Sequence, residues 1–146
     1  MGMHDYAKQS KFAEKIRQMH NAEVNGSELY FVLAYLAKEK GLSDLADVLI
    51  QNACEDALHG GMYGAMLGKG HDADDAFWQQ IVRLYRLEAS ANASLAQLAE
   101  EIRAGGEPAL ADCVAATIAE EDEHARRLEK VFVAHGIAYT KDKKEA

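Results

Sequence analysis

Two short segments of this chain pair a carboxylate with a histidine at a spacing that suits metal binding. Glu121 and His124 lie three residues apart, and so do Asp56 and His59 in an earlier segment. On a helix this spacing places both side chains on one face, about one turn apart. A carboxylate oxygen and an imidazole nitrogen held in this way supply two ligands of a transition-metal site. Each segment alone is weak evidence, because the same spacing occurs on many solvated helices.

The two segments belong to an internal repeat with a period of 65 residues. The same shift relates Glu88 to Glu23, so each copy of the repeat holds two acids and one histidine. The other matches are Gly41 with Gly106, Glu55 with Glu120, and Leu45-Ala46-Asp47 with Leu110-Ala111-Asp112. This unbroken register predicts a doubled helical hairpin. Coincidence among common residues is the alternative interpretation.

Length and composition favour a single helical domain. The chain has 146 residues, of which 49% are apolar, and it contains one proline. It can therefore bury a sizeable core, and we expect residues 1–146 to form one all-α domain with short polar termini. The net charge of −8 argues against nucleic acid as a partner.

The cysteines and the hydropathy exclude two other classes of protein. Cys54 and Cys113 are the only cysteines, whereas a zinc ribbon or a rubredoxin-type iron centre needs four thiolates. We interpret both as small, buried, apolar side chains on helices. There is no signal-peptide pattern and no run of about 18 apolar residues, so we expect a cytoplasmic protein that does not bind membranes.

Four segments carry apolar residues at helical spacing, and each apolar stripe contains one of the four repeated acids. The expected helices run from about Lys11 to Lys40, from Ser43 to about His59, from Asp75 to Arg103, and from Pro108 to Gly136. The expected caps are Ser10, Ser43 and Asp72 or Asp74 at the starts, and Gly41, Gly105-Gly106 and Gly136 at the ends.

The end of the second helix receives conflicting signals. Five glycines follow His59 by residue 70, and they favour a break near Gly60-Gly61. The apolar residues among them would instead continue a helical face: Met62, Tyr63, Met66 and Leu67.

Four acids at one level of a helical bundle need compensation. A buried carboxylate without a partner costs several kcal/mol, and four of them would also repel one another. Cations at the centre resolve both problems. Four carboxylates and two imidazoles are the ligand set of a carboxylate-bridged dinuclear metal site, and mixed oxygen and nitrogen ligands suit iron, manganese or zinc.

The chain from about Lys11 to Ala134 resembles the ferritin-like superfamily, most closely its rubrerythrin-like branch. The residues that carry the resemblance are Ala22-Glu23, Tyr30, Gly41, Asp56, His59, Glu88, Gly106, Glu121 and His124. The resemblance implies a left-handed four-helix bundle, built from the two repeated hairpins, around two iron ions. It also implies that Glu23 and Glu88 are terminal ligands, that Asp56 and Glu121 bridge the metals, and that His59 and His124 each hold one metal.

The chain departs from the rubrerythrin pattern in three ways. Asp56 stands where the family usually has glutamate; it is shorter by about 1.5 Å, and neighbouring Glu55 could take over its role. Tyr85 stands where rubrerythrins tend to carry a further glutamate ligand. The rubredoxin-like domain that would supply electrons is absent.

By this resemblance, we expect a non-haem di-iron oxidoreductase that reduces hydrogen peroxide or oxygen with electrons from a separate redox protein. No catalytic residues beyond the metal ligands, and no organic cofactor, are predicted. The alternatives are a ferroxidase or iron-handling protein, and a ferritin-like bundle with an incomplete metal site and no catalysis.

In a ferritin-like bundle the second and third helices run parallel, so their link must travel back along the bundle. If the second helix ran to Leu67, the link from Gly68 to Asp74 would have to span about 32 Å. Its seven residues reach only about 25 Å. Either the helix breaks near Gly60-Gly61, or two chains exchange hairpins. We favour an exchanged homodimer, because domain-swapped forms also occur among rubrerythrin-like proteins.

For several other residues, the sequence allows either a role at the metal site or an ordinary structural role. His20 is either a spare ligand or an ordinary interface histidine, and we favour the latter. Tyr30, Tyr63 and Tyr85 either hydrogen-bond the ligands or are core aromatic residues. Trp78 is most simply a core residue, and Glu28 is most simply solvated.

Overall fold

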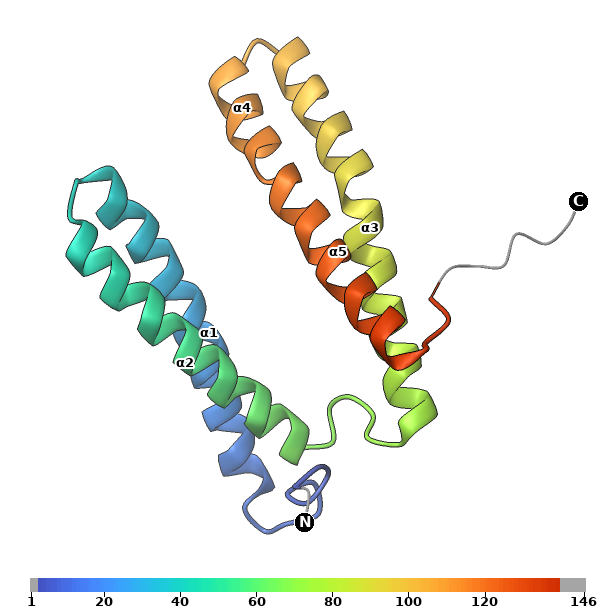
Figure 1. The fold of residues 1–146 in the computed structure, drawn as a ribbon. Helices are drawn as coiled ribbons and strands as arrows, with labels where there is room; N and C mark the ends of the chain where they lie inside the picture. The colour runs from blue at the N-terminus through green and yellow to red at the C-terminus, as the bar shows by residue number, and fades with distance from the viewer. Residues whose placement is uncertain (1–2, 140–146) are drawn as a thin grey trace, which may run out of the picture. The chain divides into compact units, whose positions relative to one another are not determined.

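The computed structural model of this chain describes residues 3–139, and these residues form helices without any strand. The helices are α1 (Ala13–Glu39), α2 (Ser43–Met66), α3 (Asp74–Ala104), α4 (Pro108–Ala116) and α5 (Ile118–His135) (Figure 1). The all-α class is confirmed. The chain divides into two compact units, which we call unit 1 (Met1–Asp72) and unit 2 (Ala73–Ala146).

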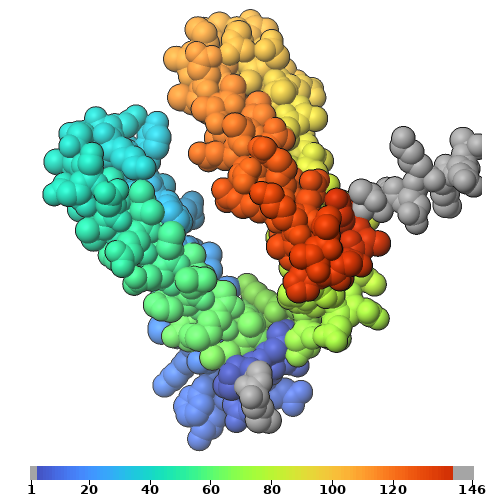
Figure 2. Space-filling model, in the orientation of Figure 1, coloured from blue at the N-terminus to red at the C-terminus, as the bar shows by residue number. Residues whose placement is uncertain are grey.

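Unit 1 is a hairpin in which α1 and α2 approach closely. The residues buried between the two helices are small, and several recur every seven residues, which keeps them on one face of each helix. They are Ser27, Ala34 and Ala37 on α1, and Ala46, Ala53, Gly60 and Gly64 on α2. Gly41 ends α1 with a positive φ of 74°, as the sequence predicted, because a residue without a Cβ adopts this conformation without strain. Figure 2 shows the side chains of the two helices in contact along the hairpin.

Of the two alternatives left open for the second helix, the break near Gly60-Gly61 does not occur, and α2 continues to Met66. Two of the glycines serve packing instead. A Cβ on Gly60 would lie 3.1 Å from Cγ2 of Val24, and a Cβ on Gly64 would lie 3.4 Å from Cε1 of His20. The close approach of α1 therefore favours glycine at these two positions, and the packing offsets their low helix propensity.

His20 is an interface histidine, as we favoured. Its Nδ1 lies 2.8 Å from the carbonyl oxygen of Gly60, and its Nε2 lies 2.6 Å from Nζ of Lys69. Since only a protonated nitrogen can donate to the carbonyl, Nδ1 carries the proton and Nε2 accepts from the lysine. The ring thus ties α1 to α2 and to the segment that follows α2.

Unit 2 packs α3 against α4 and α5. The single fourth helix that we expected is interrupted at Thr117, between α4 and α5. The hydroxyl of Thr117 donates to the carbonyl oxygen of Val114 at 2.9 Å, and such side-chain bonds to the preceding turn bend helices. Phe132 is the largest fully buried side chain, and Gly136 closes α5 with a φ of 65°.

Three smaller expectations are also corrected. The N-caps of α2 and α3 are Leu42 and Ala73, and neither makes a side-chain capping bond. Ser10 accepts a hydrogen bond from the amide of Phe12, just before α1 begins. Cys54 and Cys113 are exposed rather than buried, since both lie on outward faces of their helices. Among residues 3–139, no helix combines the length and apolarity that crossing a membrane requires.

Candidate metal centre

Unit 1 brings together three of the six predicted ligands, Glu23 of α1 with Asp56 and His59 of α2, which we call trio 1. One ligand atom from each lies within 4.8 Å of the other two. His59 Nδ1 is 3.7 Å from Oε2 of Glu23. The helices can approach here because Gly26 leaves room one turn after Glu23: a Cβ on Gly26 would lie 3.2 Å from the Asp56 carboxylate.

Unit 2 repeats this arrangement with Glu88 of α3 and with Glu121 and His124 of α5, which we call trio 2. Their ligand atoms also lie within 4.8 Å of one another. His124 Nδ1 is 3.4 Å from Glu88 Oε2 and 3.6 Å from Glu121 Oε2. The repeat found in the sequence is therefore also a repeat of geometry, with the same residue positions in contact.

The trios are accessible within their own units. The side chain of Glu23 is 24% exposed and that of Glu88 is 25% exposed, whereas the side chains of His59 and His124 are 54% and 46% exposed. With a neutral histidine and ionised acids, each trio places two negative charges within 4.8 Å of one imidazole nitrogen. Such a cluster attracts a divalent cation, which relieves the repulsion between the carboxylates.

The donor chemistry of each trio fits a transition metal. Two carboxylate oxygens and one imidazole nitrogen bind zinc, iron or manganese at about 2.0–2.2 Å, so ligand atoms around one ion lie up to roughly 4 Å apart. The observed separations of up to 4.8 Å need only small side-chain rotations. One trio leaves coordination positions open, while two trios together supply the four carboxylates and two histidines of a dinuclear site.

Neighbouring residues clarify which side chains belong to the trios. Glu55, the alternative to Asp56, is exposed and accepts a hydrogen bond from Gln51 at 3.0 Å, so it does not join trio 1. Tyr30 lines a shallow hollow together with Asp56. Neither Tyr30 nor Tyr63 hydrogen-bonds to a trio residue within the described part of the chain.

Tyr85 has a partner that the sequence did not reveal. Its hydroxyl donates to Oε1 of Glu129 at 2.7 Å. This hydrogen bond, together with burial and the nearby negative charge of Glu129, raises the pKa of Tyr85 to about 12. The repeat gave no signal for this pair, because the positions equivalent to Tyr85 and Glu129 in unit 1 are His20 and Gly64.

Comparison with family models, with curated proteins and with solved structures finds no match to this chain.

Proposed function

We propose that this chain is a rubrerythrin-like, non-haem di-iron oxidoreductase that reduces hydrogen peroxide or oxygen with electrons from a separate redox protein. One observation carries the proposal. The six residues selected by the sequence repeat fall into two trios, each with two carboxylates and one histidine, and in each trio one ligand atom per residue lies within 4.8 Å of the others. Chance exposed acids would not be expected to meet a histidine at equivalent positions in both units.

In this proposal, the residues of the chain hold the metals and set their reactivity. By the resemblance, His59 and His124 would each supply one nitrogen ligand, Asp56 and Glu121 would supply the carboxylates shared by the two ions, and Glu23 and Glu88 would each supply a terminal carboxylate. Two iron ions held in this way can deliver two electrons to a peroxide. Manganese or zinc would fit the same donors.

We further propose that the two trios meet by exchange of hairpins between two chains, in a ferritin-like bundle. His59 lies seven residues before the end of α2, and Glu88 lies fourteen residues after the start of α3. A parallel arrangement of α2 and α3 within one chain would require a link of about 32 Å. The seven residues of the link, 67 to 73, reach only about 25 Å when fully extended. Part of it is already folded back, since the amide of Lys69 donates to the carbonyl of Gly64.

A simple up-and-down bundle within one chain would not join the trios either. With α2 and α3 antiparallel, His59 would lie about 10 Å from the linked end of the bundle, and Glu88 about 21 Å. The trios would be out of register by about 10 Å, too far for shared bridging carboxylates. Exchange between two chains removes this constraint, because each bundle then takes its hairpins from different chains.

The apolar surface of unit 1 supports a partner hairpin over the trio. Beside trio 1, Leu29 and Leu33 form a hollow with Tyr30 and Asp56. Farther along the hairpin, a strongly apolar groove is lined by Leu33, Leu36, Ala37, Lys40, Leu42, Leu45 and Leu49. Leu29 is 58% exposed and Leu45 is 45% exposed within the chain. Covering these side chains with a second hairpin would stabilise the assembly by about 25 cal/mol for each Å² buried.

Changing Asp56 to glutamate should make the two metal positions more alike. Aspartate is about 1.5 Å shorter than the glutamate at the repeat position, Glu121, so one metal is held less tightly than the other. We expect titration of the native protein with iron(II) to show two unequal affinities, and Asp56→Glu to strengthen the weaker one. Two equal affinities in the native protein, unaltered by the substitution, would exclude this role for Asp56.

The proposed activity is tested by comparing the rates at which hydrogen peroxide and oxygen oxidise the reduced, iron-loaded protein. After loading with iron(II), the protein should be oxidised faster by hydrogen peroxide than by oxygen, as the rubrerythrin resemblance implies. Stopped-flow absorbance at matched oxidant concentrations measures both rates. Equal or faster oxidation by oxygen would instead favour the ferroxidase alternative. Failure to bind iron would leave a ferritin-like bundle without catalysis.

A further inference from the structure

Unit 2 contains a chain of aromatic rings. The ring centroids of Tyr85 and Phe132 are 5.5 Å apart, and those of Phe132 and Trp78 are 6.5 Å apart. Tyr139 lies beside this chain, 5.0 Å from Phe132 and 5.2 Å from Tyr85. The repeat positions in unit 1 that correspond to Tyr85, Phe132 and Trp78 are His20, Leu67 and Ala13. The shared hairpin architecture therefore does not require aromatic residues at these positions.

The inner end of the aromatic chain lies next to trio 2. Tyr85 precedes Glu88 by three residues, about one turn of α3. The hydroxyl of Tyr85 donates to Glu129 at 2.7 Å, and Tyr85 is protonated at neutral pH, as a tyrosine with an ordinary or a raised pKa is. Tyr85 is thus a neutral phenol whose proton already points at a carboxylate, the arrangement in which a tyrosine can lose an electron and a proton together.

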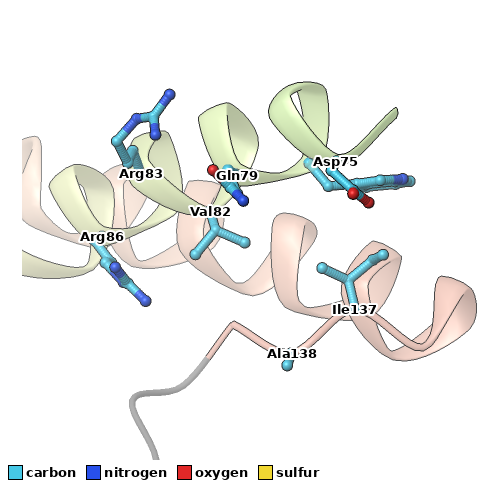
Figure 3. A pocket seen from close by; sticks show the side chains of 8 residues that line it. Asp75, Gln79, Val82, Arg83, Arg86, Ile137 and Ala138 are labelled. Carbon is cyan, nitrogen blue, oxygen red and sulfur yellow. The ribbon is translucent and has the colours of Figure 1, made fainter. Parts of the chain in front are cut away.

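The outer end of the aromatic chain reaches the surface of unit 2. Trp78 lies in an open hollow whose walls come from α3 and from the segment after α5 (Figure 3). The other residues that line the hollow are Asp75, Gln79, Val82, Arg83, Arg86, Ile137 and Ala138. Both arginines are exposed, so the hollow is lined by two guanidinium groups and one carboxylate, that of Asp75. An anionic electron donor would be attracted to this hollow.

We propose that Tyr85 and Trp78 carry single oxidising equivalents from trio 2 to the surface across the intervening ring of Phe132, with Glu129 as the proton acceptor. This inference rests on the proposed function, because the oxidant is peroxide acting at the trios. Phe132 is fully buried and fills the space between the two redox-active rings, which keeps water out of the path. Electron transfer falls steeply with distance, and ring contacts of this kind keep each step short.

The steps balance in electrons and protons. Tyr85 gives one electron towards trio 2 and its phenolic proton to Glu129, which leaves a neutral tyrosyl radical. An electron from Trp78, and the proton returned by Glu129, restore the phenol. Trp78 loses its indole proton to water in the same step. A one-electron anionic reductant in the hollow, with a proton from water, then restores Trp78. The relay protects the protein when oxidation at the trios outpaces the normal supply of electrons.

The relay can be tested in the metal-free protein, where the outcome does not depend on the proposed function. Trp78 is the only tryptophan in the chain, so azide radicals generated by pulse radiolysis oxidise a defined starting point. We expect the tryptophanyl radical to decay as a tyrosyl radical grows, at a rate independent of protein concentration; this measures the electron exchange between Tyr85 and Trp78 along the proposed path, in the reverse direction. Replacement of a positioned proton acceptor typically costs about a hundredfold or more in rate, so Glu129→Gln should slow this transfer by about that factor.

Two further variants separate the relay from ordinary packing. Tyr85→Phe keeps the ring contacts and should slow the transfer as Glu129→Gln does, whereas Tyr139→Phe, the matched control, should leave its rate unchanged. Deuterated water should slow the transfer in the native protein but not in Glu129→Gln, which a purely structural role would not produce. An unchanged rate in Tyr85→Phe and Glu129→Gln, or a loss confined to Tyr139→Phe, would overturn the proposal. Metal binding would remain a separate result in either case.

Discussion

Replacing Glu121 and His124 with alanine is expected to lower the affinity for iron(II) by at least about a hundredfold. Loss of an outer partner of a metal ligand already costs 10- to 100-fold, and both of these side chains are proposed to bind metal directly. The pair leaves Glu88 alone in trio 2, since His124 lies 3.4 Å from Glu88 and 3.6 Å from Glu121. Equilibrium dialysis, with metal analysis of the retained protein, measures the loss.

The matched control for this variant is Glu120→Ala. Glu120 is an exposed acid adjacent to Glu121 on α5, so the substitution removes one negative charge from the same helix. It should leave metal uptake almost unchanged, because it removes no proposed ligand. Helix content, measured by circular dichroism, should be native in both proteins. Unchanged uptake in the double variant would show that trio 2 does not bind the metal.

Two variants that each lack one trio are expected to restore metal binding when they are combined. One variant carries Asp56→Ala with His59→Ala, and the other carries Glu121→Ala with His124→Ala. In an exchanged dimer, each site takes trio 1 from one chain and trio 2 from the other. A mixed dimer therefore has one intact site and one site without either trio. With random pairing, half of the dimers are mixed. Because each mixed dimer has one intact site where a native dimer has two, metal uptake should reach about a quarter of the native value.

This experiment distinguishes exchange from assembly within one chain. The variants are unfolded together and refolded as a mixture, and metal uptake is compared with that of each variant refolded alone. Each variant alone should bind little metal, because every site then lacks one trio. If the mixture binds no more metal than the separate variants, the sites are formed within single chains and the exchange is wrong. Light scattering of the native protein should give the mass of a dimer.

The helices and the membership of the trios could be predicted from the sequence for a physical reason. An acid in an otherwise apolar stripe faces the same neighbour as the residues around it, so Glu23 had to point towards α2 and Glu88 towards α5. The repeat then indicated which acid-histidine pair each would meet. In the structure the residues of each trio do lie together, with one ligand atom of each within 4.8 Å of the other two; metal binding by them stays a prediction.

The features that the sequence did not predict depend on contacts between distant residues. The low helix propensity of Gly60 predicts a break in the helix. In the structure α2 is continuous through Gly60, which packs closely against Val24 of α1. The interruption at Thr117 depends on one hydroxyl bond to Val114 rather than on any helix-breaking residue. Tyr85 and Glu129 are 44 residues apart, and no local pattern or repeat links them.

The most direct test of the central claim is the distance between the two metals. The protein is loaded with iron(II) and examined by X-ray absorption at the iron edge, which reports the neighbours of each iron atom. Two trios that share one centre predict an iron-iron separation of about 3.5–4 Å, with only oxygen and nitrogen atoms nearer to each iron. Bound iron that shows oxygen and nitrogen neighbours but no second iron would contradict the dinuclear centre.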